Sequence, residues 1–417
     1  MTKRIIQDNF HVNLQSTKKF KSTRIHISFG SDLTTEHVTK RALLPYLLRA
    51  VSTKFDTRAK MSSYLDNLYA AQFGVGSSKV GLSHFISFDL SVINDKYTID
   101  NESLFEEGIL FLKEIITNPL FKEDVFLDEK RLLSEYFLSV YANKMRVAIK
   151  HLQTEMFKEE LYQVSALGIE EQVADITLKD VIDEYHHMIT HDKITISVVG
   201  DINEQDVLAI INKHFTFKNR NKELELFESN PNTIIEPKEH ILTQDVTQAK
   251  LAMGFRCDIR YLDSDYYAAI VFNNVFGGSS DSILHQRIRE ELGLVYFVSS
   301  SYDFYKGVLF VFAGINEEEY SRTTSEVEQI LNTIIDGTLD KQYLDIAKKT
   351  IINNMIESRD SNYNLVIRLE RKDLFDRDIS LEESIENIKK VTFKQVQEVA
   401  KKIVLDTTVL LRGENNE

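Results

Sequence analysis

The chain has 417 residues, of which 43% are hydrophobic and 27% charged, with only 15 glycines and 4 prolines. This composition is typical of a well-packed, helix-rich protein and argues against disorder, and the length predicts two domains. The 64 acidic side chains outnumber the 50 basic ones, giving a net charge of −14, which disfavours nucleic acid as a partner.

The cysteine count and the N-terminus together predict a cellular location. The single cysteine, Cys257, cannot form an internal disulfide, which fits a reducing compartment. The first residues, MTKRIIQDNF, lack the apolar core of a signal peptide, and no apolar run approaches the roughly 20 residues that span a bilayer. We therefore expect a cytoplasmic protein with no membrane partner.

The first half of the chain shows alternating strand and helix patterns. Alternation predicts a strand at 21–30, and helical spacing then predicts helices at 33–54 and 57–71. Two strands follow at 73–82 and 84–92, and an amphipathic helix at 102–118 stops before Pro119. We further expect one long helical tract at 123–159, a helix at 178–188 and a strand at 193–201.

The second half of the chain repeats the first. Residues 218–240 are polar, lack periodicity and hold Pro231 and Pro237, so they are interpreted as a linker. After them, segments such as GVLFVFAGI and TTVLLRGEN echo HFISFDLSV and ITISVVGDI at offsets of about 210 to 225 residues, as a duplication would give. The prediction is an α+β fold with two homologous domains, 1–217 and 241–417, each a mainly antiparallel sheet backed by helices.

Most familiar motifs of enzyme chemistry are absent from the sequence. There is no phosphate-binding or dinucleotide-binding glycine pattern, no nucleophile elbow, and neither H-E-x-x-H nor H-x-x-E-H. In YHHMITH, His187 and His191 are four apart and could share zinc on one helical face; alternatively, they simply end a helix. The runs TTEH (34–37) and PKEH (237–240) are interpreted as turns or caps.

One stretch, GGSSDSILHQRIREELGLVY (277–296), combines several features that could mark a site. Arg287 and Glu291 are four apart and are expected to pair on an exposed helix face, and Gly293 is a good left-handed terminator. Spacing alone leaves two interpretations open, a solvated helix or a functional site.

Residues 276–301, FGGSSDSILHQRIREELGLVYFVSSS, resemble the second-domain signature of the pitrilysin/insulinase zinc peptidases, the inverzincins, approximately F-G-G-G-x-S-S-R-L-F-Q-x-[IV]-R-E-x-x-G-L-A-Y. The resemblance implies a clam-like pair of duplicated domains with the metalloenzyme LuxS/peptidase-like fold. It implies that Arg289 and Tyr296 are catalytic, donating hydrogen bonds from across the chamber to the substrate carbonyl oxygen. It also implies that Gly277, Gly278 and Ser279 bind substrate.

The first domain departs from the family at its zinc motif. Where H-x-x-E-H would stand in the first helix, the sequence reads LPYLLRAV, with Pro45, Leu48 and Arg49 at the three functional positions. Proline has no ligand atom, leucine cannot transfer a proton, and arginine stays cationic. This half of the site is therefore degenerate.

The downstream acidic ligand of the family is also missing. In EKRLLSEY, Glu129 keeps the first acidic position, but Tyr136 stands at the second. Glu135 is one residue away, which turns it by about 100° around a helix. The resemblance therefore implies that this chain binds no cofactor itself and is not an enzyme on its own.

A chain with the arginine and tyrosine but without zinc ligands resembles the non-catalytic subunits of heterodimeric inverzincins. The resemblance implies as partners a homologous zinc-containing peptidase subunit and a peptide substrate, with the zinc in the partner. In isolation the chain could also form a homodimer. Among such subunits it looks most like bacterial proteins linked to modification of elongation factor P. The alternative function is that of a structural or assembly protein with a peptidase-like fold.

Overall fold

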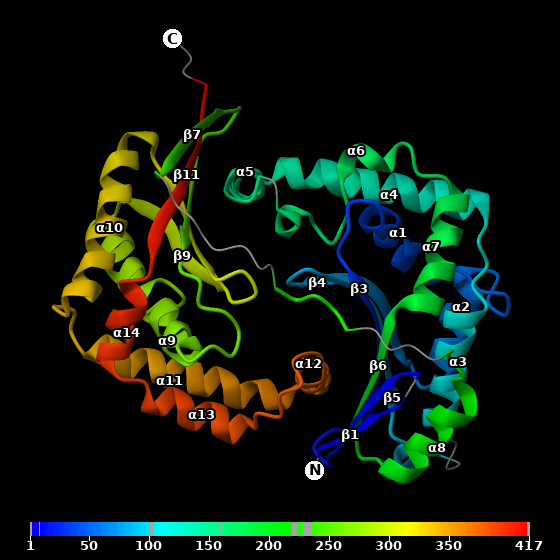
Figure 1. Cartoon of the computed structure of the whole chain (residues 1–417). Coiled ribbons are helices and arrows are strands. Elements are labelled where there is room, and N and C mark those ends of the chain that lie inside the picture. Colours follow the sequence, from blue (N-terminus) through cyan, green and yellow to red (C-terminus); the bar gives the residue numbers. More distant parts are fainter. Residues whose placement is uncertain are drawn as a thin grey trace. The chain divides into compact units, whose positions relative to one another are not determined.

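The computed structural model describes residues 2–7, 9–99, 103–158, 160–218, 223–227 and 236–414. The chain divides into two compact units, and Figure 1 shows the elements of each. Unit 1 comprises Met1–Phe137, Val164–Leu226 and Glu357–Asp378, and unit 2 comprises Leu138–Gln163, Phe227–Ile356 and Ile379–Glu417. Each unit therefore contains a segment from the other half of the sequence, whereas the predicted ranges 1–217 and 241–417 are continuous.

Unit 1 is built around a sheet with helices on both faces. In chain order its elements are β1 (Thr2–Ile6), β2 (His11–Ser16), β3 (Ser22–Asp32), α1 (Val38–Leu48), α2 (Arg58–Asn67), β4 (Gln72–Val80), β5 (Ser83–Ile93), α3 (Leu104–Thr117), most of α4 (Glu123–Ala142), α6 (Glu170–Val173), α7 (Leu178–His191), β6 (Lys193–Gly200), α8 (Glu204–His214) and α12 (Asn362–Leu374).

Unit 2 contains a second sheet with its own helices. Its elements are α5 (Lys144–Met156), β7 (Lys238–Thr243), β8 (Ala249–Arg256), α9 (Tyr266–Phe276), the π-helix η3 (His285–Glu291), β9 (Val295–Asp303), β10 (Val308–Ile315), α10 (Tyr320–Asp336), α11 (Gln342–Glu357), α13 (Leu381–Lys390), α14 (Phe393–Ala400) and β11 (Val404–Arg412). Short 3₁₀ turns lie at Asp95–Tyr97, Leu161–Gln163, Glu317–Glu319 and Ser358–Asp360.

The two sheets have the same strand order. Within the described residues the first sheet is β1-β2-β6-β3-β5-β4 and the second is β7-β11-β8-β10-β9, so the two orders match position by position once β1 is set aside. In each sheet the strand at the matched edge runs parallel to its neighbour, β2 to β6 and β7 to β11. The following pairs are all antiparallel. The shared order confirms the predicted α+β design with two related sheets.

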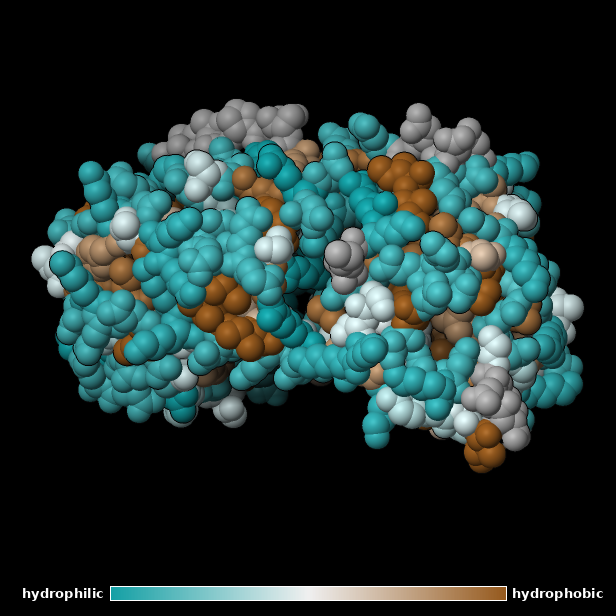
Figure 2. All heavy atoms as spheres, turned by 90° about the horizontal axis from the view of Figure 1, so that it is seen from below, coloured by the Kyte–Doolittle hydropathy of each residue, from teal (hydrophilic) through white to brown (hydrophobic). Residues whose placement is uncertain are grey.

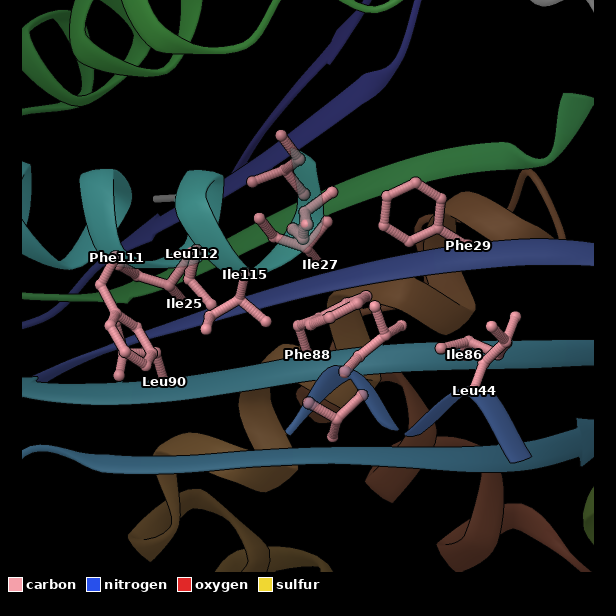
Figure 3. Close-up of a cluster of buried hydrophobic side chains, with 14 of the residues drawn as sticks. Ile25, Ile27, Phe29, Leu44, Ile86, Phe88, Leu90, Phe111, Leu112 and Ile115 are labelled. Atoms are coloured by element: carbon pink, nitrogen blue, oxygen red, sulfur yellow. The ribbon is translucent and has the colours of Figure 1, made fainter. Parts of the chain in front are cut away.

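The core of unit 1 lies between its sheet and the helices on one face. Figure 3 shows side chains of β3, β5 and α3 meeting there, all of them buried: Ile25, Ile27, Phe29, Ile86, Phe88, Leu90, Phe111, Leu112 and Ile115. Alternation along β3 sends every second side chain to this core. The intervening residues, such as His26 and Ser28, therefore face the opposite side of the sheet.

That opposite side is covered in each unit by a helix from the other half of the sequence. In unit 1, α12 packs its buried Leu365, Val366 and Leu369 against Val199 of β6. In unit 2, α5 packs against β8 and β11. A Cβ added to Gly254 of β8 would lie 2.1 Å from Met156 Sδ of α5, so the helix rests directly on the strand.

The structure confirms most of the predicted elements and corrects three. The predicted helix 33–54 spans only Val38–Leu48. The predicted tract 123–159 breaks at Asn143, whose side chain accepts a hydrogen bond from the Arg146 N–H and so caps the second helix. The predicted linker 218–240 ends inside β7, and its residues 219–222 and 228–235 lie outside the described residues.

Figure 2 shows one face of the molecule, where hydrophobic residues form separate areas within a mostly hydrophilic surface. Across the described part of the chain, none of the helices combines the length and the apolar character that crossing a bilayer requires.

Candidate functional site

Arg289 and Tyr296 lie on adjoining elements of unit 2. Arg289 is on η3, and Tyr296 is the second residue of the edge strand β9. Gly293, with a φ of 63°, turns the chain between them, as its sequence position predicts. Arg287 and Glu291 form the expected pair at 2.7 Å. The structure differs from a regular α-helix, because Leu292 N donates to the carbonyl of Arg287, five residues earlier. Such π-helical turns are frequent at functional sites.

The side chains of Arg289 and Tyr296 are both exposed enough to contact a molecule that binds to unit 2. The Arg289 side chain is 45% exposed and contacts His285 at 2.9 Å and Glu290 at 3.7 Å. Tyr296 is 60% exposed, and its hydroxyl donates to the side-chain oxygen of Asn316 at 3.2 Å. None of these contacts buries the donor groups. Arg289 can therefore present N–H donors to an oxygen of another molecule, and Tyr296 can present its one O–H when the hydroxyl turns away from Asn316.

The glycine pair before η3 has a packing role in unit 2. A Cβ on Gly277 would meet Leu284 and Ser300 at 2.7 Å, and the carbonyl of Gly277 accepts a hydrogen bond from Ser300 N. A Cβ on Gly278 would meet Asn273 at 2.8 Å. The absence of side chains thus lets the turn fit against β9 and α9. The substrate-binding role of Gly277, Gly278 and Ser279 stays a prediction.

The positions that the resemblance assigns to the H-x-x-E-H motif lie on α1 of unit 1 or directly after it, and their side chains offer no metal ligand. Pro45 is inside the helix and buried, Leu48 is fully buried, and Arg49 is exposed beyond the last turn. The Arg49 guanidinium lies over the Tyr46 ring, 4.8 Å from its centroid. Because a buried leucine and an internal proline offer no polar atom to a metal, this part of α1 does not fit a zinc ion.

Glu129, the acidic residue that the sequence retains, already has a cationic partner. Its side chain is 2% exposed, and Arg58 of α2 donates to it. Burial raises the pKa of Tyr46, Arg49 opposes this rise, and Tyr136 and Glu129 add to it. These groups therefore gather around one place, where the Arg58 guanidinium is the positive charge bound to Glu129.

The alternative carboxylate at this place points elsewhere. Glu135 is 54% exposed and pairs with Arg131 at 2.5 Å on the surface of α4. Tyr136, the next residue, is half-buried. The arrangement follows from helix geometry, because adjacent residues point about 100° apart. The side chains at the positions that the resemblance assigns to zinc therefore do not form a donor set that fits the metal.

The histidines of YHHMITH lie at the end of α7, which ends at His191 as the helix-end interpretation predicts. The rings of His187 and His191 stack at 4.6 Å, and His37, just before α1, stacks on His187 at 5.2 Å. Glu184, the nearby carboxylate, accepts from His37 at 2.5 Å and from the buried Arg41. In the described residues this column is not among the groups with metal-ligand geometry.

One metal-compatible group was missed by the sequence analysis. His151, Glu155 and His240 of unit 2 bring their ligand atoms within 4.8 Å of one another. Lys238, Glu239 and His240 lie in β7, so the interpretation of PKEH as a turn is wrong for its last three residues. The spacing of His151 and Glu155, four apart in a predicted helix, was the available signal. The third member could not be paired with them from sequence.

Comparisons with known proteins point to one family. A family model described as the peptidase M16 inactive domain matches residues 175–351. The probable inactive metalloprotease YmfF of Bacillus subtilis (strain 168) is 33% identical over 407 residues, covering 96% of this chain and 95% of the relative. The non-peptidase homolog YmxG of Helicobacter pylori (strain ATCC 700392 / 26695) is 26% identical over 320 residues, covering 72% of this chain and 74% of the relative. The crystal structure of a conserved protein from Enterococcus faecalis V583 has a TM-score of 0.93 at 29% identity, covering 100% of this chain and 99% of that chain.

The strand order defines a duplicated α+β protein, and the positions that the resemblance assigns to the zinc motif hold no metal-binding side chain. The chain belongs to the M16 peptidase family, the pitrilysin/insulinase family that its arginine and tyrosine signature resembles. Within that family it is a non-catalytic, peptidase-like homologue.

Proposed function

We propose that this chain is the non-catalytic subunit of a cytoplasmic, heterodimeric zinc metallopeptidase. A homologous subunit with an intact H-x-x-E-H motif supplies the zinc and the general base. This chain supplies Arg289, Tyr296 and part of the chamber wall, and the substrate is a peptide. A link to modification of elongation factor P belongs to the same proposal and rests on the resemblance of the whole chain.

One contrast carries the proposal. The Arg289 and Tyr296 donors are exposed on unit 2, whereas the zinc positions of unit 1 hold a buried proline, a buried leucine and a carboxylate bound to Arg58. Exposed donors without a metal can stabilise an oxyanion but cannot activate a water molecule. Hydrolysis therefore requires a second molecule that carries the metal.

The direct test is peptide hydrolysis by the reconstituted pair. This chain is mixed with the H-x-x-E-H homologue from the same cell, and turnover of a fluorogenic peptide library is measured for wild type, Arg289→Ala and Tyr296→Phe. Loss of an oxyanion donor should lower kcat by roughly 10²- to 10³-fold. Arg287→Ala is the matched control, because Arg287 lies on the same π-helix and its side chain is also about half exposed. Equal turnover for wild type and both variants would eliminate the proposal.

A structural or assembly role is the second candidate, and one observation favours it. Arg289 and Tyr296 each have a side-chain contact within unit 2, as ordinary surface residues would. Purification of the native protein from its cell separates the two functions. An H-x-x-E-H homologue in the complex supports the peptidase subunit, and a complex without any peptidase homologue supports the scaffold.

A further inference from the structure

Three side chains of unit 2, two from α5 and one from β7, converge on a single point. His151 and Glu155 are four residues apart, so they share one face of α5. His240 stands on β7, at the edge of the second sheet. One ligand atom from each side chain lies within 4.8 Å of the other two. Among the residues that the structure describes, this is the one group of histidine, cysteine, aspartate and glutamate side chains with that geometry.

The spacing of these atoms is close to that of a metal site. In a tetrahedral zinc site with bonds of about 2.0 to 2.1 Å, neighbouring ligand atoms lie about 3.4 Å apart. His240 Nε2 and Glu155 Oε2 are 3.6 Å apart. The rings of His151 and His240 have centroids 5.4 Å apart and planes inclined at 72°, so neither ring stacks flat against the other. A single ion bound among the three ligand atoms would require their side chains to rotate toward it from these separations.

The group also contains a polar atom that the protein itself does not satisfy. His240 Nε2 is shielded from solvent and has no hydrogen-bond partner. Buried polar atoms without a partner are rare in folded proteins and call for an explanation such as a bound ion. Within the described part of the chain, Glu155 pairs with His240 alone. Both groups therefore have capacity for a further ligand.

At the corresponding place in unit 1, an arginine pairs with the carboxylate. β2 occupies the position in the first sheet that β7 occupies in the second, and His11 of β2 contacts Asp373 of α12 at 2.8 Å. There the Arg4 guanidinium also binds Asp373, at 2.7 Å, and its positive charge compensates the carboxylate. In unit 2 a second histidine stands beside the carboxylate instead. The duplication thus places an ion pair in one unit and an open His/Glu/His set in the other.

The identity of the donors favours zinc. Two imidazole nitrogens and one carboxylate oxygen are a frequent zinc set, with the fourth position left for water. Calcium takes six to eight oxygen ligands and magnesium an octahedral set, so neither fits. We propose that His151, Glu155 and His240 form a zinc-binding site that fastens α5 to β7. This site is distinct from the degenerate position on α1 and departs from the expectation that the chain binds no metal at all.

Binding at this place has a structural consequence. α5 comes from the first half of the sequence and β7 from the second, so one ion would crosslink two segments that are far apart in the chain. Zinc would bind the folded unit 2 and not the unfolded chain. At a free zinc concentration 100 times Kd, the ratio of folded to unfolded unit 2 should rise about 100-fold.

The test uses the full-length chain, stripped of metal by a chelator and titrated with zinc alone. Wild type should bind one zinc per chain, and Co²⁺ should give the visible absorption of a tetrahedral site. His240→Gln and His151→Gln should weaken binding by at least about 100-fold, since each removes one of three ligands. His191→Gln, a histidine of unit 1, is the matched control and should bind zinc as wild type does.

Folding of the variants is checked by thermal unfolding without zinc. Zinc should raise the Tm of wild type and His191→Gln but not that of His240→Gln. Zinc retained equally by His240→Gln and His151→Gln would show an adventitious ion only, and failure of the wild type to bind would overturn the site outright. Neither measurement involves peptide hydrolysis, so a negative result for the zinc site would leave the proposed subunit role unaffected, and the reverse also holds.

Discussion

Replacing Arg58 by alanine tests whether its guanidinium acts as the counter-charge of Glu129. Arg58 donates to Glu129, and the other carboxylate oxygen of Glu129 is buried without a hydrogen-bond partner. Arg58→Ala therefore leaves a buried carboxylate with no cation bound to it. We expect unit 1 to lose stability.

The expected loss in the free energy of unfolding follows from the unequal exposure of Arg58 and Glu129. Breaking a fully buried ion pair costs about 3 to 5 kcal/mol, and an exposed pair contributes about 0 to 1 kcal/mol. Here Glu129 is 2% exposed but the Arg58 side chain is 64% exposed, so water can reach the space that the arginine leaves. An intermediate loss of about 2 to 3 kcal/mol is expected, or roughly 5 to 10 °C in Tm for a unit of this size.

A double-mutant cycle with Glu129→Gln isolates the charge. Glutamine keeps the shape of the side chain but removes the charge, so Arg58→Ala should cost less than about 1 kcal/mol in that background. The assay is urea unfolding of the four proteins, followed by circular dichroism and by fluorescence. An equal cost of Arg58→Ala in both backgrounds would refute the idea that Arg58 acts as a counter-charge, because packing alone would then explain the loss.

Two further predictions concern unit 1. Burial lowers the pKa of His26, but Glu370 and Asp89 outweigh it and raise the pKa to about 10. The stability that the protonated ring contributes is therefore complete below the unfolded pKa of about 6.5 and is lost as the pH rises through about 10. His26→Gln should remove a slope of up to about 1.4 kcal/mol per pH unit between these values, measured by urea unfolding from pH 6.5 to 9.5; the same slope in both proteins would contradict this reading. Restoring H-x-x-E-H with Pro45→His, Leu48→Glu and Arg49→His should create no zinc site on α1, because position 48 is fully buried and Glu129 is bound by Arg58. Zinc titration of this triple variant in the His240→Gln background checks the point, and stoichiometric binding there would show it to be wrong.

The sequence predicted the sheet-forming segments well, because strands with one face buried leave an alternating pattern. β3, β5 and β6 were found within a few residues of their ends, and so was their repeat in the second half. β1, β2 and β7 were missed. The residues of β7, KEHILT, follow Pro231 and Pro237 in a polar stretch. Only its pairing with β11 makes this segment a strand, and pairing partners far apart in sequence leave no local signal.

The same distinction between local patterns and distant partners applies to the site residues. Linear motifs single out Arg289, Tyr296 and the altered zinc-motif positions, whose roles stay predictions, and the sequence also predicted that Glu135 points away. What local pattern could not supply was the partner of each group: Arg58 for Glu129, and His240 for His151 and Glu155. The π-helical turn at Arg289 was also invisible, since residue types that favour an α-helix favour this wider turn as well.

The exchange of α5 and α12 sets the order in which the protein can mature on the ribosome. The first sheet lacks its covering helix until Asp378 has been synthesised, and by then most of the second unit has already emerged. Cutting the gene at the connecting segment would therefore yield two fragments that must reassociate by complementation, each missing one helix that the other carries.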